Sequence, residues 1–296
     1  MSDILLQARN LSITFGGLKA VQDVSLDVPQ GSLTALVGPN GAGKTTLFGL
    51  LSGFLKPGAG SVHFAGQDIT GQAPYESARL GLTRTFQIVQ PFGAQTVRQN
   101  IAVGAHLRLA DRDEALAAAE AVAARVNLQA SLDKPAADLT VAGRKRLELA
   151  RALATRPRLL LLDEVLAGLN PSEIDEMIPV VKKLVDDGVT VLMIEHVMRA
   201  VMSLAEHVWV LAQGRLIASG TPGEVTRDPK VVEAYLGHGA AARLAAQGAP
   251  AGARCWRSRA CGRATVAWKC CAAWTWTCRR ARSWCCWAAM ARANPR

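Results

Sequence analysis

Short apolar stretches and amphipathic stretches alternate along most of this chain, which predicts strands separated by helices. The apolar or alternating runs typical of strands are residues 4–8, 24–28, 33–37, 61–64, 159–162, 189–194, 207–211 and 216–219. The runs with helical periodicity are residues 45–53, 114–126, 145–154, 172–186 and 197–205. This order predicts an α/β domain in which helices cover a mostly parallel sheet.

The first predicted strands follow one another too closely for helical crossovers, so we expect a small antiparallel sheet near the N-terminus. The N-terminal residues show strand-like alternation and an early charge instead of the basic flank and apolar core of a secretory signal. The longest purely apolar runs are far shorter than the roughly 20 residues that a membrane helix needs. We therefore expect a cytoplasmic protein that reaches a membrane only through a partner.

Charge and cysteine content divide the 296-residue chain into two parts. The chain has a formal net charge of +10, but eleven of its 34 Lys and Arg residues and none of its 24 Asp and Glu residues lie in residues 240–296. Residues 1–239 therefore hold 23 basic and 24 acidic side chains, without the basic excess typical of nucleic-acid binding. All seven Cys and six of the seven Trp also lie in the tail. We expect one domain over residues 1–239 and a separate tail over residues 240–296.

A glycine-rich motif follows the predicted strand at residues 33–37 and precedes a helical pattern. It reads Gly38-Pro39-Asn40-Gly41-Ala42-Gly43-Lys44-Thr45-Thr46. A strand, this motif and a helix in succession are typical of a phosphate-binding P-loop, whose backbone amides and helix N-terminus surround an anion. Lys44 would contact the outer phosphates, and the Thr45 hydroxyl would bind Mg²⁺. The sequence therefore predicts a nucleotide site.

Two carboxylates end the most apolar of the predicted strands. Asp163 and Glu164 directly follow four leucines, and the carboxyl ends of parallel strands are where ligands bind in α/β sheets. Asp163 suits the ligand shell of Mg²⁺, and Glu164 suits a general base that polarises the attacking water. Such a pair is often only a solvated turn, but together with a P-loop it predicts nucleotide hydrolysis.

With these motifs in this order, residues 4–238 resemble the ATP-binding cassette (ABC) ATPases. The resemblance implies a P-loop α/β domain with a helical subdomain that carries the signature motif of the family. It also implies that Phe15 stacks on adenine, that Gln87 senses Mg²⁺ and the transmembrane partner, and that His196 contacts the γ-phosphate. The segment at residues 168–171 resembles the loop that contacts the opposite subunit of an ATPase dimer.

The signature departs from the family pattern, which is usually Leu-Ser-Gly-Gly-Gln. The corresponding residues here are Leu139-Thr140-Val141-Ala142-Gly143. In the family, the serine and glycine amides of one domain contact the γ-phosphate that the other domain holds. Thr140 keeps a hydroxyl, but Val141 and Ala142 add Cβ atoms where the backbone must approach closely. The resemblance thus implies a complete ATP site on this chain's own motifs and a weaker site where its signature serves a partner.

Residues 81–87, 144–146 and 163–171 resemble those of one branch of the family, the ATP-binding subunits of branched-chain amino-acid importers. The resemblance implies ATP-driven import through permease subunits, with a separate substrate-binding protein and a location at the cytoplasmic face of the inner membrane. Importers of urea, amides or aromatic compounds share these traits, and export of lipid or lipopolysaccharide is a further alternative. A nucleic-acid-associated ABC ATPase fits less well, because a coiled-coil insertion and a second cassette are both missing.

The tail could be a metal-binding or membrane-surface appendage, but its Cys spacing fits no tetrahedral zinc site. The genetic code offers an alternative interpretation. Read one base earlier, every Trp or Cys codon encodes Leu, Val or Met, so an apolar strand read out of frame becomes rich in Trp and Cys. Some shifted residues are forced. Thr275 and Thr277 become Asp, whereas Ala288 and Ala291 become Gly.

With permitted codons, residues 268–296 can read VEVLRGVDLDVPAGEVVVLLGRNGAGKST, a second P-loop. This string aligns without gaps with residues 18–46, and its forced glycines fall on Gly38 and Gly41. We therefore interpret the residues from about 255 onward as an out-of-frame reading of a neighbouring homologous ATPase gene, without a defined fold. The nucleotide sequence in the preceding frame tests this interpretation. Such a neighbour would be a natural second half of an ATPase heterodimer.

Overall fold

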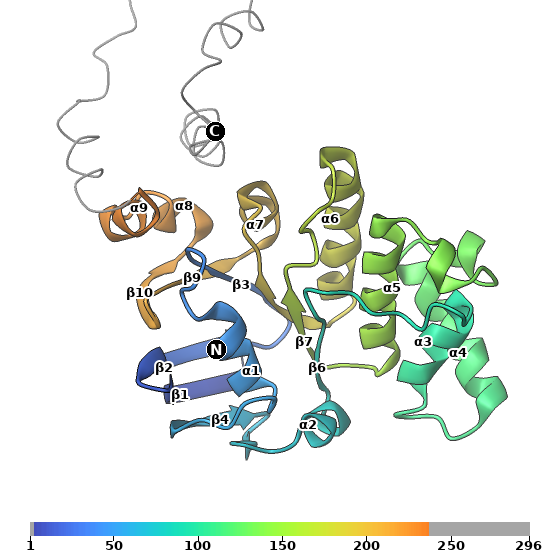
Figure 1. Ribbon diagram of the computed structural model, residues 1–296, viewed down its shortest axis with the longest axis horizontal. Helices are drawn as coiled ribbons and strands as arrows, with labels where there is room; N and C mark the ends of the chain where they lie inside the picture. Colours follow the sequence, from blue (N-terminus) through green and yellow to red (C-terminus); the bar gives the residue numbers. More distant parts are fainter. Residues whose placement is uncertain (1–2, 237–296) are drawn as a thin grey trace, which may run out of the picture. The chain divides into compact units, whose positions relative to one another are not determined.

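Two β-sheets and several surrounding helices form the part of the chain that the computed structural model describes, residues 3–236 (Figure 1). The predicted tail over residues 240–296, with its out-of-frame interpretation, lies outside the described residues. Within residues 3–236, no helix is long and apolar enough to span a membrane.

The first sheet is antiparallel, which confirms the prediction from the close spacing of the early strands. Its order is β2-β1-β4-β5, and its strands are β1 (Ile4–Phe15), β2 (Leu18–Pro29), β4 (Ala59–Phe64) and β5 (Gln67–Asp68). β1 and β2 are longer than their apolar runs predict. Their pairing continues to Phe15 and Leu18 across a turn in which Gly16 and Gly17 have positive φ, as tight hairpins require.

The second sheet has six strands in the order β10-β9-β3-β8-β7-β6 and is parallel except at β10. The strands are β3 (Leu33–Val37), β6 (Leu82–Arg84), β7 (Leu159–Asp163), β8 (Thr190–Ile194), β9 (His207–Ala212) and β10 (Arg215–Gly220). β3, β7 and β8 are buried along their whole length, which explains their continuous apolar runs. The sequence did not predict β6, because three residues carry no periodic signal.

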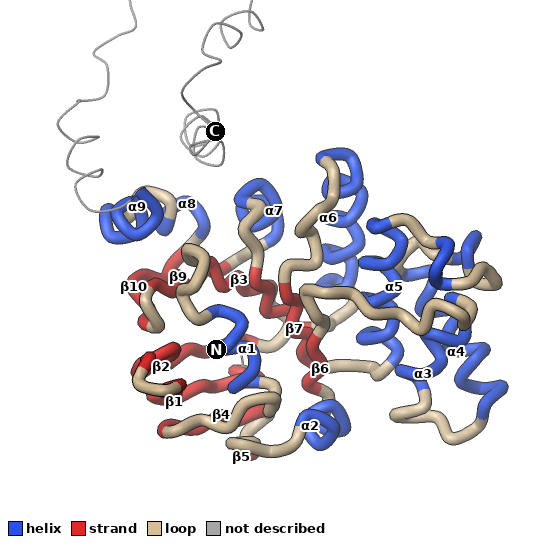
Figure 2. Tube along the Cα trace, in the orientation of Figure 1, coloured by secondary structure: helices blue, strands red, loops and turns tan. Residues whose placement is uncertain are grey.

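Helix α1 (Lys44–Leu51) lies between the two sheets, and Figure 2 shows it between the two groups of red strands. Its Leu47 and Phe48 are fully buried, and they belong to one core that contains residues of β1, β2 and β4 as well as β3, β7 and β8. Burial on both sides holds α1 firmly. The loop that precedes α1 is therefore fixed at the carboxyl end of β3.

The remaining helices surround these sheets. They are α2 (Pro74–Leu80), α3 (Val97–Ala105), α4 (Arg112–Arg125), α5 (Val141–Ala154), α6 (Pro171–Asp186), α7 (Met198–Leu204), α8 (Pro222–Val225) and α9 (Pro229–Leu236). In Figure 1, α3, α4 and α5 gather into a helical lobe that extends from the sheets, and these helices pack on one another. α5 begins four residues earlier than its periodicity predicts, because Thr140 caps it by accepting the Gly143 N–H.

Candidate functional site

The P-loop connects β3 to α1, and close backbone contacts determine which of its residues must be glycine. Gly38, Gly41 and Gly43 all have positive φ. A Cβ on Gly38 would lie 2.0 Å from the carbonyl oxygen of Leu211 in β9, and one on Gly43 would lie 2.4 Å from that of Ala20 in β2. Only glycine fits between these strands, so the loop is held by backbone on both sides.

Lys44 is the first residue of α1, and its ammonium donates to the loop carbonyl oxygens of Gly38 at 2.8 Å and Pro39 at 3.0 Å. Burial lowers the pKa of Lys44, whereas the nearby carboxylates of Glu164 and Asp163 act in the opposite direction. The structure therefore brings the predicted phosphate-binding cation close to the two carboxylates at the end of β7. It leaves Thr45 exposed at the start of α1.

Asp163 ends β7 and is almost completely buried. Its Oδ2 accepts a hydrogen bond of 2.7 Å from the guanidinium of Arg84, and its Oδ1 is buried without a partner among the described residues. A buried, unpaired carboxylate oxygen near a lysine-bearing P-loop is suited to a hard divalent cation, since Mg²⁺ prefers oxygen ligands. The chemistry of Asp163 and of the Thr45 hydroxyl thus fits the predicted Mg²⁺ site.

Glu164 is the residue on which the other predicted catalytic side chains converge. The Gln87 Nε2 donates to Glu164 Oε2 at 2.7 Å, and His196 Nδ1 lies 3.9 Å from the same oxygen. These residues are far apart in the sequence, yet parallel strands β6, β7 and β8 end beside one another and bring them together. Gln87 contacts the predicted base Glu164 in this structure, whereas the family resemblance implies a contact with Mg²⁺.

Two other predicted segments lie apart from this cluster. Phe15 ends β1 and is 46 % exposed, so its ring is accessible for stacking. The signature residues surround the N-terminus of α5, where the Thr140 hydroxyl caps the helix. Val141 is 59 % exposed and Ala142 is buried, so Val141 is the larger obstacle to close backbone approach. Among the described residues, no hydrogen bond joins the signature residues Leu139–Gly143 to the P-loop.

Lys145 is a site residue that the sequence did not single out. It lies in α5 and is buried, and its ammonium donates to the carbonyl oxygens of Gln87 at 3.0 Å and Glu164 at 3.2 Å. Burial lowers the pKa of Lys145, while four nearby carboxylates, led by Glu195, raise it. Lys145 therefore joins the signature helix to the backbone of both the Gln87 loop and the predicted base. A lysine in a basic run is usually solvated, which hid this role.

Tyr235, in the last described helix, also reaches the nucleotide loop. Burial raises the pKa of Tyr235 to about 12, and a hydrogen bond with the backbone of Gly38 acts in the opposite direction. The C-terminal helix α9 therefore touches the first glycine of the P-loop. No motif marks this contact, because it joins residues at opposite ends of the domain.

Glu195 precedes His196 and is a buried carboxyl group that the sequence also missed. Its Oε1 accepts the Leu166 N–H at 2.9 Å, and its Oε2 has no partner among the described residues. Burial raises the pKa of Glu195 from 4.5 to about 7, and the nearby Glu164 adds to the shift. Hydrogen bonds from Leu166 and from the His196 backbone, and the charge of Lys145, oppose it.

This shift predicts a pH-dependent stability that Glu195→Gln removes. Because the folded pKa lies above the unfolded value, folding favours the protonated form. The associated stabilisation is complete below about pH 4.5 and disappears as the pH rises to about 7. Between pH 5 and 8 we expect the unfolding free energy of the unchanged chain to fall by about 2–3 kcal/mol more than that of Glu195→Gln. Urea unfolding at both pH values measures these free energies. An equal change with pH in the unchanged chain and in Glu195→Gln would contradict the assignment.

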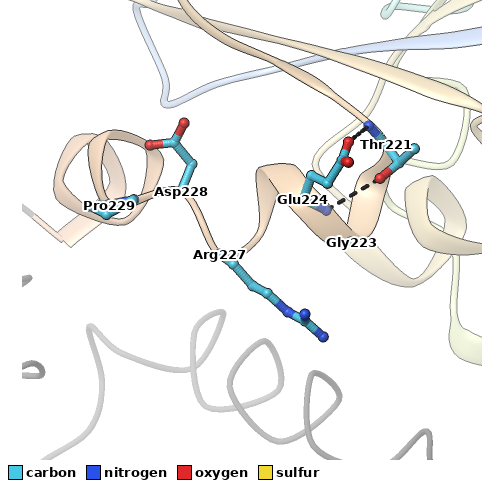
Figure 3. A pocket seen from close by; sticks show the side chains of 6 residues that line it. All are labelled: Thr221, Gly223, Glu224, Arg227, Asp228 and Pro229. Atoms are coloured by element: carbon cyan, nitrogen blue, oxygen red, sulfur yellow. Dashed lines mark hydrogen bonds between the residues drawn. The ribbon is translucent and has the colours of Figure 1, made fainter.

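A shallow hollow lies elsewhere, at α8 and the turn into α9 (Figure 3). It is lined by Thr221, Gly223, Glu224, Arg227, Asp228 and Pro229. The dashed lines show Glu224 and Thr221 in a reciprocal capping box, with bonds of 2.8 and 3.4 Å. This pairing completes the N-terminus of α8. None of the predicted nucleotide-site residues lines the hollow, so its polar groups serve the local fold.

The fold and this site define a P-loop ATPase of the cassette type. Residues 21–167 match the family model described as ABC transporter, and residues 215–241 match that of the branched-chain amino acid ATP-binding cassette transporter. The high-affinity branched-chain amino acid transport ATP-binding protein BraF of Pseudomonas aeruginosa is 40 % identical over 253 residues, which cover 80 % of this chain and 99 % of BraF. LivG of Escherichia coli K12, named for the same role, is 38 % identical with the same coverage. The chain belongs to this family of ABC transporter ATP-binding subunits.

Solved structures agree with this assignment. A nucleotide-free ATP-binding cassette from an ABC transporter has a TM-score of 0.73 and 32 % identity, covering 79 % of this chain and 100 % of its own. A cassette in its ADP conformation has a TM-score of 0.73 and 33 % identity, covering 80 % and 100 %. The predicted ABC ATPase fold and the ATPase activity are therefore confirmed at the level of the family.

Proposed function

We propose that this chain hydrolyses Mg²⁺-ATP at the site around Glu164 to power the import of branched-chain amino acids. The observation that carries the hydrolytic part is the convergence of Gln87 and His196 on Glu164, next to the partnerless oxygen of Asp163. The relatives' names and the match over residues 215–241 support the class of substrate. Because the transported molecule does not enter the ATPase, the substrate rests on the relatives alone.

Each side chain has a task that follows from its position. The P-loop amides and Lys44 hold the phosphates, as donors at a helix N-terminus. Asp163 and the Thr45 hydroxyl hold Mg²⁺, which neutralises phosphate charge when it is bound. Glu164 accepts a proton from the attacking water, and His196 contacts the γ-phosphate beside it. A carboxylate has about four acceptor positions, so Glu164 can accept the Gln87 hydrogen bond and still accept a proton from water.

The same reasoning assigns the partners. We infer permease subunits that hold the chain at the cytoplasmic face of the inner membrane, and a substrate-binding protein that acts through them. A second, homologous ATPase subunit would complete a heterodimer. The out-of-frame interpretation of the tail supports it, because that interpretation places such a gene next to this one. The exposed Val141 supports it as well, since a partner would supply the better signature.

Transport by the assembled complex tests the proposal. The permeases, both ATPases and the binding protein are reconstituted in proteoliposomes, and the uptake of radiolabelled leucine, isoleucine and valine is measured with ATP and with ADP. We expect uptake with ATP and none with ADP. We also expect leucine, isoleucine and valine to compete with one another for uptake. Urea, acetamide and phenylalanine serve as alternative substrates. ATP-driven uptake of one of these without leucine uptake would contradict the proposed substrate.

A further inference from the structure

Arg84 forms a buried ion pair with the carboxylate that the proposed function assigns to Mg²⁺. Its guanidinium lies 2.7 Å from Asp163 Oδ2, and the two side chains are only 8 % and 1 % exposed. Thr85 fixes the register between them, because its N–H donates to the Leu161 carbonyl oxygen and its hydroxyl accepts the Asp163 N–H. The pair is therefore built into the pairing of β6 with β7 and does not depend on a flexible surface contact.

Three aromatic rings surround the same guanidinium. Its central carbon lies 5.8 Å from the ring centres of Phe48 and Phe54, and 5.5 Å from that of Phe86. Phe54 and Phe86 also contact each other edge to face, with ring centres 5.4 Å apart. Cation–π attraction is strongest for a desolvated cation. The rings thus hold the guanidinium plane in place and leave little freedom to the bond with Asp163.

We propose that Arg84 is a positioning residue of the ATPase site, which holds Oδ2 of Asp163 so that Oδ1 is left for Mg²⁺. This inference rests on the proposed function, and the unpaired, buried state of Oδ1 supports it. The nearby alternative partners for Asp163 are Lys44 and Lys145, which both already interact with its charge. Without Arg84, the buried carboxylate turns to these ammonium groups, and Oδ1 is no longer left free for the metal.

The three rings of Phe48, Phe54 and Phe86, here called the ring cage, also join the metal site to the protein surface. Phe48 is fully buried, but Phe54 is 50 % exposed and Phe86, next to Gln87, is 42 % exposed. A change in either exposed ring alters the support of Arg84 and, through it, Asp163. The proposal therefore predicts that substitution at Phe54, whose ring lies against Arg84 and Phe86, also weakens metal binding.

Metal binding by the full chain tests the proposal independently of turnover. Mn²⁺ affinity is measured by electron paramagnetic resonance in the presence of ATP, and ATP affinity is measured separately with a chelator. The variants are Arg84→Met, Arg84→Lys and Phe54→Leu. Arg9→Met is the matched control, because Arg9 forms an Asp27 ion pair of 2.6 Å with both side chains well exposed.

We expect Arg84→Met to weaken Mn²⁺ binding by about 10- to 100-fold, as losing a partner of a metal-binding carboxylate does, with chelator-treated ATP binding retained. Arg84→Lys keeps the charge without the planar group, so its loss of Mn²⁺ affinity should be intermediate, and the loss in Phe54→Leu should be smaller.

If Arg84→Met does not fold, the other two variants decide. Unweakened Mn²⁺ binding in the folded variants would overturn this inference only. No Mn²⁺ binding by the unchanged chain would overturn the proposed function as well.

Discussion

Glu164→Gln is expected to lower the ATP turnover of the assembled transporter by about 10²- to 10⁴-fold while ATP binding is retained. The substitution preserves the size of the side chain and its ability to accept the Gln87 amide hydrogen bond. It removes the negative charge and, with it, the capacity to accept a proton from water. Steady-state phosphate release by the complex and ATP binding by the isolated chain measure the two effects.

An exposed acidic residue provides the control for this variant. Glu120 is paired with Arg98 at 3.3 Å on the surface of the helical lobe, and its side chain is 66 % exposed. Glu120→Gln changes the net charge by the same amount and should leave turnover unchanged, since exposed pairs contribute little. Turnover of Glu164→Gln equal to that of the control would show that Glu164 is not the base.

Gly38→Ala is expected to abolish ATP binding and to lower the unfolding free energy by about 2–5 kcal/mol. The new Cβ would lie 2.0 Å from the backbone oxygen of Leu211, at a φ of +156°. The obstacle is the backbone of β9, which pairs with β3 inside the sheet, so no rotamer change relieves it. Urea unfolding and ATP binding by the full chain check both parts.

Gly41→Ala is the matched control in the same loop. Gly41 also has a positive φ, of +77°, but its Cβ would meet nothing within 4 Å. We expect a loss of about 1–2 kcal/mol from the left-handed backbone alone. Equal destabilisation by the two alanines would mean that the Leu211 contact does not determine the shape of the loop.

Much of the fold follows from patterns that are local in the sequence. β3, β7 and β8 lie within one residue of their predicted bounds, because strands buried on both faces are apolar at nearly every position. β6 and α2 were missed for the opposite reason. Each is short. β6 is stabilised by its pairing with β7, and α2 by a capping interaction at its start, and periodicity records neither.

The site was predictable only where a residue belongs to a motif. The sequence predicted the P-loop, Asp163 and Glu164 from their spacing, and Gln87 and His196 from the resemblance. It did not predict Arg84, Lys145, Glu195 or Tyr235, although each contacts a motif residue or its loop. Their side chains are ordinary in composition, and their roles arise from burial and from partners that lie far along the chain.

The sequence by itself determined the family and the P-loop ATPase chemistry, and it predicted the phosphate-binding and acidic residues. These depend on short segments whose backbone conformation is nearly fixed by glycine, by the strand before and by the helix after. The tertiary structure alone decided which groups restrain them. The Arg84–Asp163 pair joins residues from separate strands, and its ring cage draws on α1 and the loops beside it. Such contacts require burial of charge and exact packing, and only the folded chain supplies both.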